Sequence, residues 1–416
     1  MSPTVAVVSF PGNNCEVESM RTLRENGITP LYFRWNDDRA KLRDVDGYFL
    51  PGGFAYEDRG RSGMVAGRDP LMDFIAREAE AGKTVIGNCN GAQVLVESGL
   101  IPLGKGLQMS LARNAIKVGD GWRSPGFLSE WIWMTPACAT DRCATSNWTG
   151  AMHLPIAHGE GRFTTEDKDL LAELEANNQL AFKYCDASGA VSEDQPVTPN
   201  GAVHAVAGIC NAAGNVVAIM PHPERTKNGD RYFQALRFWL EKPRKNYAHP
   251  AAAVAKPWAI ADRSADGVEI FIGTLIVNNE ERTVEQAAKR SAPGLKLRQW
   301  KYLLLPEYAV AKALSDLTVF NPRKERAYLR RKGELQRWNA DAKRGEPVAG
   351  GSLQSVLGSR LLLRRDVPDT GAGSFGTGSQ TGVCYGCDGV DDVVMARRDV
   401  LEIFCNPHAG TLERIV

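Results

Sequence analysis

The segment from Thr4 to Leu95 alternates short apolar strands with helical stretches, and this alternation limits the fold more than any other feature of the chain. TVAVVSF begins the pattern, PLYFRW and DGYFL continue it, and TVIG ends it, with helical spacing in CEVESMRTLRENG and RDPLMDFIAREAEAGK. Continuous apolar strands are typical of a parallel sheet covered on both faces. The pattern predicts a doubly wound, mostly parallel α/β sheet, in which ligands lie at the carboxyl ends of the strands.

Cys89 directly follows the last of these strands, in the sequence Gly87-Asn88-Cys89-Asn90-Gly91. Small neighbours allow a sharp strand–turn–helix bend that lifts a nucleophile above the sheet. The N–H groups at the start of the following helix favour a thiolate and can stabilise an oxyanion. A cysteine between glycines is also compatible with a packing role, so a catalytic role requires partners elsewhere in the chain.

Two further strand ends supply such partners. His222 and Glu224 stand two residues apart in MPHPER, and in extended chain residues i and i+2 face the same side. LPGGF places Gly52 and Gly53 after another strand, where exposed N–H groups can complete an oxyanion hole. Together these features favour a Cys-His-Glu acyl-transfer site. A metal site explains them less well, because no second Cys or His accompanies Cys89 at ligand spacing.

The motifs GNCNGAQ, PGGF and PHPER resemble those of class I glutamine amidotransferases. More narrowly, VSFPGNNCE, LPGGFAYEDRGRSG, PIAHGEGRF, FKYCDASG and IMPHPER resemble the glutaminase subunits of phosphoribosylformylglycinamidine synthase, from about residue 4 to residue 240. The loop YEDRGRSG and the turn NGA depart from the pattern that is common in that family. The catalytic motifs are intact, so the departures bear on the partner more than on the chemistry.

The resemblance implies a role for each motif residue. Cys89 would form the glutamyl thioester, His222 would be the general base, and Glu224 would orient it. The resemblance also implies an oxyanion hole and a glutamine pocket built around Gly53, Asn90, Gln93, His158 and Glu160.

The same resemblance implies the partners. L-glutamine would be the substrate, and ammonia would pass to a separate synthetase subunit, with a small third subunit as a further candidate partner. The chain has no phosphate-cradling glycine loop, so ATP and Mg²⁺ are expected only on the synthetase and no cofactor in the glutaminase domain. Two alternatives stay open: a glutaminase that serves a different synthetase, such as one that modifies a purine-like base, and a scaffold protein built on an amidotransferase fold.

The length of 416 residues is too great for one typical core and predicts two domains. The expected division is a glutaminase domain over 1–243, a Pro- and Ala-rich linker over 244–262, and an extension over 263–416. A net charge of +1 gives no bias toward nucleic acid. No apolar run approaches the roughly 18 residues of a membrane span, and no signal peptide is evident, so a cytoplasmic location is expected. Nine dispersed cysteines fit a reducing compartment.

The extension is predicted to be an α+β domain. GVEIFIGTLIV, EERTVEQAAKRSA and LKLRQWKYLLL read as strand, helix and strand, and NPRKERAYLRRKGELQRWNADAKRG as a basic helix with an apolar stripe. A solvated face is the favoured interpretation of its basic charge, with docking of an acidic partner and then nucleotide or RNA binding as alternatives. A fused small third subunit would explain the strand–helix–strand start, but the extension is too long for that alone.

Four residues near the C-terminus have the spacing of a zinc site. Cys384 and Cys387 form one pair and Cys405 and His408 the other, with 405 − 387 − 1 = 17 residues between the pairs. This spacing can close a tetrahedral zinc site. Free cysteines are the favoured interpretation, and a structural zinc site and a redox pair are the alternatives.

Overall fold

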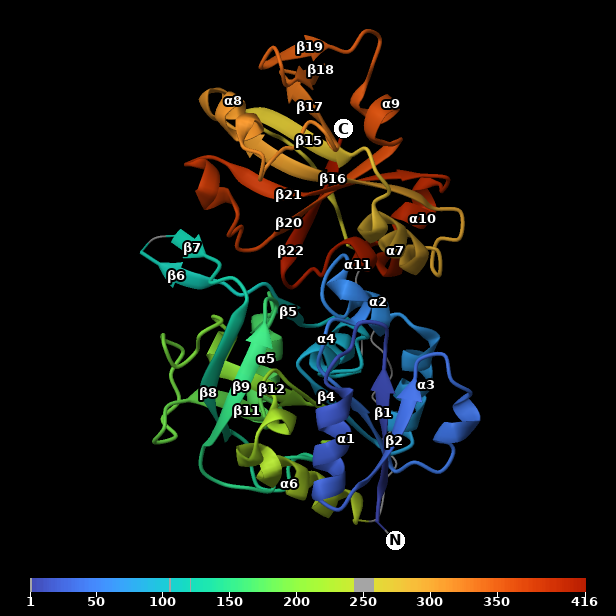
Figure 1. The fold of residues 1–416 in the computed structure, drawn as a ribbon, viewed down its shortest axis with the longest axis vertical. Helices are drawn as coiled ribbons and strands as arrows, with labels where there is room; N and C mark the ends of the chain where they lie inside the picture. Colours follow the sequence, from blue (N-terminus) through green and yellow to red (C-terminus); the bar gives the residue numbers. More distant parts are fainter. Residues whose placement is uncertain (1, 105, 120, 243–257) are drawn as a thin grey trace. The chain divides into compact units, whose positions relative to one another are not determined.

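The computed structural model describes residues 2–104, 106–119, 121–242 and 258–416 (Figure 1). The chain divides into two compact units, residues 1–116 with 125–255 and residues 117–124 with 256–416. Most of the predicted linker, residues 244–257, lies outside the described residues. The expected limits 1–243, 244–262 and 263–416 therefore stay a prediction.

The first unit is built on a nine-stranded sheet with the order β2-β1-β3-β4-β13-β12-β11-β8-β9. The five strands from β2 to β13 pair in parallel, and the remaining four pair antiparallel. The bounds are β1 Thr4–Ser9, β2 Thr29–Arg34, β3 Gly47–Leu50, β4 Thr84–Asn88, β8 Leu128–Pro136, β9 Met152–His158, β11 Phe182–Cys185, β12 Val206–Cys210 and β13 Val216–Ile219. The predicted mostly parallel α/β sheet is confirmed, and the parallel half carries the predicted site motifs.

Six α-helices among the described residues accompany this sheet. They are α1 Glu16–Glu25, α2 Met64–Gly67, α3 Pro70–Glu80, α4 Asn90–Glu97, α5 Lys168–Ala176 and α6 Asp230–Leu240. In α3 the sequence explains both the start and the buried face. Asp69 caps the helix by accepting from Leu71 N, and Pro70 occupies the first position, where a missing N–H costs nothing. Leu71 and Ile75 are then buried against the sheet core.

Two small sheets complete the N-terminal half of the chain. β5 Ser110–Ala112 pairs with β10 Arg162–Thr164, and β6 Ile116–Val118 pairs with β7 Gly121–Arg123. Strand β4 is buried along its whole length, as expected for the centre of a sheet covered on both faces. Its end at Asn88 therefore opens directly onto the turn that holds Cys89.

The second unit contains another nine-stranded sheet, with the order β14-β22-β20-β21-β16-β15-β17-β18-β19. Its strands are β14 Ala261–Asp262, β15 Val268–Thr274, β16 Lys296–Leu305, β17 Glu325–Arg331, β18 Glu334–Asn339, β19 Arg344–Pro347, β20 Arg360–Asp366, β21 Gln380–Asp388 and β22 Gly410–Ile415. Its helices are α7 Asn279–Ala288, α8 Glu307–Ser315, α9 Leu353–Leu357, α10 Asp392–Met395 and α11 Arg398–Phe404. The predicted strand, helix and strand at its start are confirmed as β15, α7 and β16.

The predicted basic helix over residues 321–345 is wrong. The segment forms the strands β17, β18 and β19. Lys332 and Gly333 both adopt positive φ, 47° and 85°, between β17 and β18. Two such residues in a row make the hairpin turn that matches the twist of paired strands. The alternate buried residues Ala327 and Leu329 follow the strand period of two, which the helical reading of the segment overlooked.

Candidate active site

Cys89 lies in the turn between β4 and α4 with φ 51° and ψ −109°. A non-glycine residue rarely adopts positive φ, and the strain is typical of nucleophile turns. Its amide donates to Ile219 O at 2.8 Å, which ties the turn to the end of β13. The residue is 4% exposed. The predicted sharp bend after β4 is therefore present.

The two glycines that flank Cys89 are required by close backbone approach. A Cβ on Gly87 would lie 2.5 Å from Gly91 O, and a Cβ on Gly91 would lie 2.0 Å from Leu50 O. Any side chain at either position would push α4 away from β3 and β4. The motif Gly-Asn-Cys-Asn-Gly thus has a steric explanation.

His222 and Glu224 follow β13 and form a buried pair. His222 Nδ1 lies 2.6 Å from Glu224 Oε1, and both residues are 1% exposed. The other carboxylate oxygen of Glu224 accepts from Asn88 Nδ2 at 3.0 Å, and Tyr232 OH donates to Asn88 Oδ1 at 3.2 Å. Asn88 immediately precedes Cys89, so the turn that holds the sulfur also holds the carboxylate.

The charges of this pair are set by its neighbours. Burial alone would lower the pKa of His222, but the Cys89 sulfur and the Glu224 carboxylate outweigh it and hold that pKa well above its usual value. Burial would raise the pKa of Glu224, but His222 and Asn88 hold it below its usual value. The result is an imidazolium between a carboxylate and a sulfur. A cation beside a cysteine stabilises its thiolate, the nucleophilic form.

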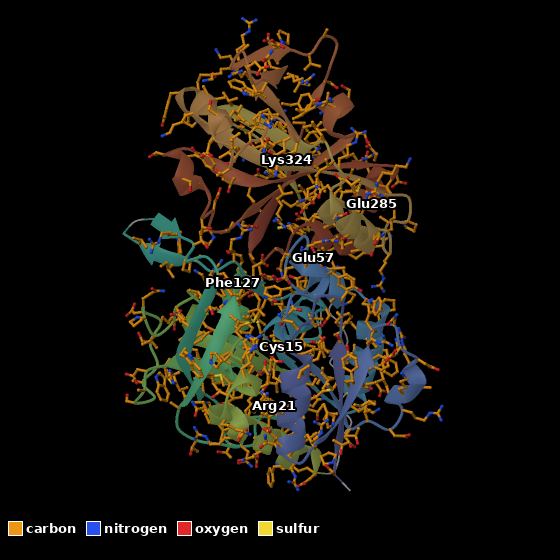
Figure 2. All side chains as sticks on the ribbon, in the orientation of Figure 1. Cys15, Arg21, Glu57, Phe127, Glu285 and Lys324 are labelled. Carbon is orange, nitrogen blue, oxygen red and sulfur yellow. The ribbon has the colours of Figure 1, made fainter. Side chains whose placement is uncertain are left out.

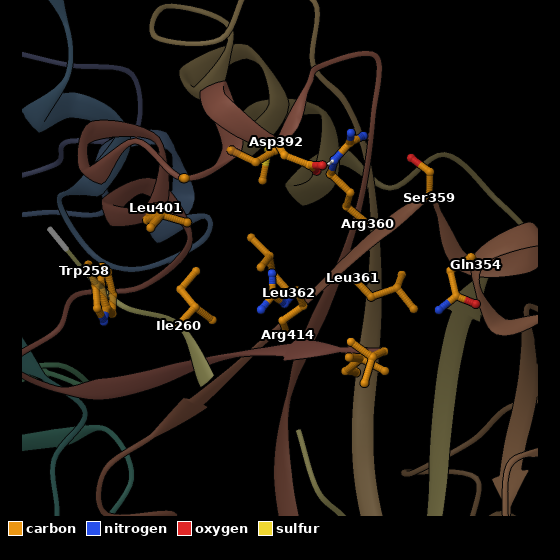
Figure 3. A pocket seen from close by; sticks show the side chains of 14 residues that line it. Trp258, Ile260, Gln354, Ser359, Arg360, Leu361, Leu362, Asp392, Leu401 and Arg414 are labelled. Atoms are coloured by element: carbon orange, nitrogen blue, oxygen red, sulfur yellow. Dashed lines mark hydrogen bonds and ion pairs between the residues drawn. The ribbon is translucent and has the colours of Figure 1, made fainter. Parts of the chain in front are cut away.

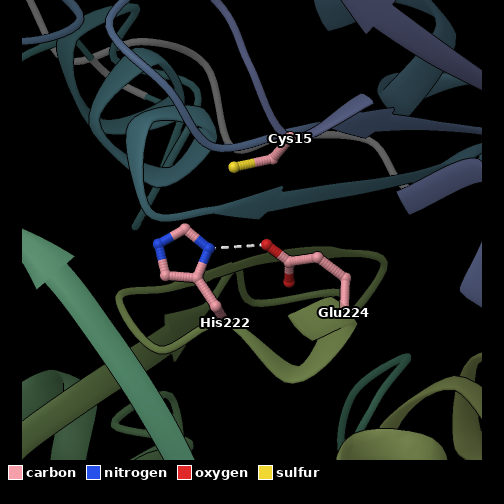
Figure 4. A group of neighbouring side chains, drawn as sticks. All are labelled: Cys15, His222 and Glu224. Atoms are coloured by element: carbon pink, nitrogen blue, oxygen red, sulfur yellow. Dashed lines mark hydrogen bonds and ion pairs between the residues drawn. The ribbon is translucent and has the colours of Figure 1, made fainter. Parts of the chain in front are cut away.

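A second cysteine, which the sequence motifs do not predict, lies at the same imidazole. Cys15, Glu224 and His222 place ligand-type atoms within 4.8 Å of one another, and all three are buried (Figure 4). Cys15 directly precedes α1 (Figure 2). Arg225 Nη2 donates to its sulfur at 2.9 Å. Burial raises the pKa of the Cys15 thiol. Cys15 has no strained strand–helix turn beneath it, so the geometry favours Cys89 as the nucleophile.

The loop after β3 reaches the same place. A Cβ on Gly52 would lie 2.6 Å from His222 Cε1, so this glycine packs directly on the imidazole. Asn90 joins the loop to the start of α4, because its Oδ1 accepts from Ala55 N at 2.9 Å and from Asn13 Nδ2 at 3.2 Å. Gly53 has φ 134°, and a Cβ there would lie 2.6 Å from Asn14 N. The two backbone segments predicted to form the oxyanion hole therefore converge beside His222.

Of the three predicted glutamine-pocket residues, Gln93 and Glu160 are hydrogen-bonded to each other, whereas His158 is bonded to Asn114. Gln93 accepts from Asn90 Nδ2 at 2.9 Å and donates to the Glu160 carbonyl, so its side chain is committed to the loops around the site. Glu160 Oε2 accepts from Ser62 N at 2.9 Å. His158 ends β9 with its Nδ1 3.2 Å from Asn114 Oδ1. Burial and the nearby His222 lower the pKa of His158 to about 3, so it stays neutral.

Asp58 is a second residue that the sequence analysis missed. Burial and the nearby Glu160 carboxylate raise its pKa to about 7, and Asn90 Nδ2 donates to its Oδ1 at 3.1 Å. It lies in the loop YEDRGRSG, which departs from the common family pattern. The tightly turned residues Tyr56 and Glu57, both at positive φ, lead into it. An acidic residue after a glycine turn is a common sequence pattern, so it does not predict that Asp58 is largely buried with a raised pKa.

The four residues of the zinc alternative, Cys384, Cys387, Cys405 and His408, do not meet in metal-ligand geometry. Cys384 and Cys387 lie three residues apart on β21, so their side chains point to opposite faces of the sheet. Burial keeps both thiols protonated, because it raises the pKa of Cys387 to about 12 and holds the pKa of Cys384 well above its usual value. Cys405 and His408 do not join them. Within the ranges that the structure describes, the only His, Cys, Asp or Glu cluster with metal-ligand geometry is Cys15 with His222 and Glu224.

Taken together, the site places a strained cysteine, a charged imidazole and an orienting carboxylate at the carboxyl ends of β4 and β13. His222 Nε2 is buried and has no hydrogen-bond partner among the described residues. That nitrogen is therefore available to exchange a proton with a reacting group. A cysteine nucleophile with such a base performs acyl transfer on amides or esters.

The chain is similar to known proteins over its first unit. Residues 2–236 match the CobB/CobQ-like glutamine amidotransferase domain. The chain is 40% identical over 224 residues to phosphoribosylformylglycinamidine synthase subunit PurQ of Methanothrix thermoacetophila, covering 53% of this chain and 86% of that protein. It is also 40% identical over 231 residues to the same subunit of Salinibacter ruber, covering 54% of this chain and 88% of that protein.

Among solved structures, the structure of PurLQS from Thermotoga maritima matches with 31% identity and a TM-score of 0.46. The match covers 58% of this chain and 100% of that chain. The described part of the chain has no helix that is both long and apolar enough to cross a membrane.

Proposed function

The chain belongs to the CobB/CobQ-like glutamine amidotransferase family, and we propose that it is the glutaminase component of phosphoribosylformylglycinamidine synthase. It hydrolyses L-glutamine and supplies ammonia to an ATP-dependent synthetase in purine biosynthesis. The relatives at 40% identity carry this name as subunits, and this chain covers 86–88% of their length. The observation that carries the chemistry is the buried His222–Glu224 pair beside the strained Cys89 turn.

The proposed reaction has two halves. The Cys89 sulfur attacks the side-chain carboxamide carbon of glutamine, and the backbone N–H groups of Gly53 and Asn90 stabilise the oxyanion. The C–N bond breaks, and the leaving ammonia takes a proton from His222. Water then attacks the thioester, His222 accepts a proton from that water, and glutamate leaves as the Cys89–carbonyl bond breaks.

Several structural details support these roles. Glu224 is anchored by Asn88, so it holds the imidazole with one carboxylate oxygen while the other is fixed. Asn90 is the first residue of α4, where backbone N–H groups have no partner within the helix. We assign a supporting role to Gln93, Glu160 and His158, which hold the loops around the sulfur.

A synthetase subunit would complete the reaction and would bind ATP and Mg²⁺. We also propose that the second unit of the chain takes the place of a small third subunit of this enzyme. Its predicted strand–helix–strand start supports this assignment, because β15, α7 and β16 form one compact motif.

The decisive experiment is glutamine hydrolysis by the purified chain with and without the synthetase. Cys89→Ala is expected to abolish hydrolysis, because the loss of a covalent nucleophile removes several orders of magnitude of rate. Cys210→Ala on β12 is the matched control, since it removes another buried thiol and is expected to retain activity. Normal turnover by Cys89→Ala would show that the nucleophile is wrong. Activation by a different synthetase only would show that the assigned partner is wrong.

A further inference from the structure

The sheet of the second unit is symmetric about its middle. Its six inner strands have the order β22-β20-β21-β16-β15-β17. In each half the first strand, β15 or β20, lies between the second strand, β16 or β21, and the third, β17 or β22. The two halves meet where β16 pairs with β21 in antiparallel register. Such an arrangement is what two copies of one module produce when they join edge to edge around a two-fold axis.

The pairing registers agree with this symmetry residue by residue. Strand β15 maps onto β20 with an offset of 92, as 268 + 92 = 360 and 274 + 92 = 366. The pair Glu269–Arg330 then maps onto Leu361–Ile415, because 330 + 85 = 415.

The second ladder and the junction follow the same rule. The pair Val268–Leu305 maps onto Arg360–Cys387, because 305 + 82 = 387. With that offset Lys301 corresponds to Val383, and these two residues face each other across the junction. Equivalent residues meet in this way only on a two-fold axis.

Hydrogen bonds outside the strands repeat with the same offsets. Asn321 Oδ1 accepts from Arg323 N at 3.1 Å, and Asn406 Oδ1 accepts from His408 N at 3.0 Å. Both asparagines precede proline and are 85 residues apart, since 321 + 85 = 406. This Asn-Pro turn leads into the third strand of each half.

In each half, a backbone hydrogen bond joins the end of the first strand to the Asn-Pro turn. The amide that follows β15 and the amide that follows β20 both donate to a residue of the Asn-Pro turn, as Leu275 N to Lys324 O at 2.8 Å and Val367 N to Ala409 O at 2.9 Å. The offsets are again 275 + 92 = 367 and 324 + 85 = 409. Lys324 marks this turn in the first half (Figure 2). Chance would not reproduce strand order, register and turn bonds together.

The halves differ where their surroundings differ. In the first, α7 follows β15, whereas residues 367–379 after β20 contain only the short turn Ala372–Phe375. Beyond β17 lies β18, whose Trp338 packs with Ile270 and Leu329. Among the described residues, the strand beyond β22 is β14, which has two residues.

A cavity marks the missing strand. A volume of about 440 Å³ is lined by Leu362 and Arg414, the equivalents of Ile270 and Leu329, together with Leu361, Ile415 and Trp258 (Figure 3). In the first half, Trp338 of β18 belongs to the same buried cluster as the equivalent residues Ile270 and Leu329. The second copy thus has no equivalent of β18, a strand that lies outside the module, and the cavity is found beside the strands that correspond to β15 and β17.

We propose that residues 268–331 and 360–415 are two copies of one module, and that β16 is an association edge whose natural partner is a second copy of the same module. Without that partner, the full length of β16 would be an open edge of unpaired N–H and C=O groups. Here the second copy is supplied within the same chain. The unit therefore completes its own sheet and needs no second chain or free small subunit to do so. This inference does not depend on the glutaminase chemistry of the first unit.

The test uses the full chain and changes only the connection between the copies. Residues 348–359 join β19 to β20, which stand six places apart in the sheet, about 29 Å at about 4.8 Å per strand. Deleting residues 348–352 leaves only α9 and the two residues after it to connect β19 with β20. This connection spans about 18 Å, which is shorter than the distance between the two strands. Copies that pair within one chain can then no longer meet, so they are expected to pair between two chains in a swapped dimer.

Light scattering during size-exclusion chromatography is expected to give the deletion variant twice the molecular mass of a control. In the control, residues 348–352 are replaced by five Gly and Ser residues. A second variant, lacking only Gly350 and Gly351, is expected to dimerise as its concentration rises. Glutamine hydrolysis should be the same in all three proteins. The proposal is overturned if both deletions stay monomeric, or if both lose the β-sheet signal of the second unit in circular dichroism.

Discussion

At the scale of single residues, Glu224 decides how His222 behaves. The carboxylate lies 2.6 Å from Nδ1 and helps to hold the pKa of His222 well above its usual value. Glu224→Gln keeps the shape of the side chain and removes its charge. We expect hydrolysis to fall by about 100-fold, within the range that general acid–base catalysis contributes. The alkaline limb of the pH–rate profile should move to lower pH, because the imidazolium loses its proton more easily.

The pH–rate profile distinguishes this role from a structural one. Glu18→Gln is a suitable control, because Glu18 pairs with Arg225 at the rim of the same region and is not bonded to His222. It should leave both limbs of the profile in place. An unchanged alkaline limb in Glu224→Gln would contradict the assigned role.

Asp58 makes stability depend on pH. A free aspartate ionises near pH 4, whereas burial and Glu160 raise the pKa of Asp58 to about 7. Between these values the folded state holds a proton that the unfolded state releases, so rising pH favours unfolding. The stabilising effect is complete below about pH 4 and is lost as pH rises through about 7. Three pKa units correspond to at most about 4 kcal/mol.

Asp58→Asn should remove this dependence, because an amide keeps the oxygen that accepts from Asn90 and does not titrate. Hydrogen-exchange mass spectrometry at pH 5 and pH 7.5 follows the segment around Cys89 separately from the rest. Relative to the variant, the natural protein should lose protection there at the higher pH. An equal pH response in the two proteins would contradict the raised pKa.

At the scale of elements, the active site depends on the close approach of α4 to β3. A Cβ at Gly91 would lie 2.0 Å from Leu50 O, so Gly91→Ala must displace the helix. Overpacking of this kind costs about 1–3 kcal/mol. We expect a lower urea midpoint and a large loss of hydrolysis, since the Cys89 turn moves with α4. Gly121→Ala is the control, because its nearest neighbour would be 3.9 Å away, and it should change neither quantity.

The same scale shows what the sequence could predict. The strands before Cys89 and His222 are buried apolar runs with glycine or proline after them, so local signals sufficed to place both residues. The sequence does not predict Cys15 as a site residue, because only the fold brings it close to His222. The sequence of residues 321–345 predicts a helix because its many charged residues obscure the alternation of buried and exposed side chains. That alternation is fixed by the pairing of β17 with β15. Contacts made across the sheet are not encoded in local spacing.

At the scale of the whole molecule, the duplication in the second unit escaped detection for a related reason. Only the Asn-Pro turns recur as sequence, while the strands keep little beyond apolar character. Hydrogen-bond register preserves the two-fold relation even where side chains have diverged. A reading from sequence alone finds the extension too long for one small subunit, whereas two paired copies account for that length.

The two units have separate cores, and this leads to a prediction for their unfolding. Arg263 is buried in the second unit, where it donates to Glu413 Oε2 at 2.9 Å and to Tyr302 OH at 3.1 Å and lies 3.8 Å from Glu269. Arg263→Met removes the buried positive charge that pairs with the carboxylates of Glu413 and Glu269. This loss is expected to lower the free energy of unfolding by about 3 kcal/mol. For a unit of about 150 residues this lowers its transition temperature by roughly 6–12 °C.

Calorimetry of the full chain is expected to show two transitions, of which Arg263→Met lowers only one. The matched control is Arg414→Met. It removes the ion pair between Arg414 on β22 and Asp262 on β14, whose side chains are both more than half exposed. Exposed pairs contribute little, so this variant should unfold almost as the natural protein does. Glutamine hydrolysis should be lost at the transition that Arg263→Met leaves unchanged, because Cys89, His222 and Glu224 all lie in the first unit. A single transition would show that the two units unfold as one cooperative body. Loss of hydrolysis at the transition that Arg263→Met lowers would show that the glutaminase site depends on the second unit.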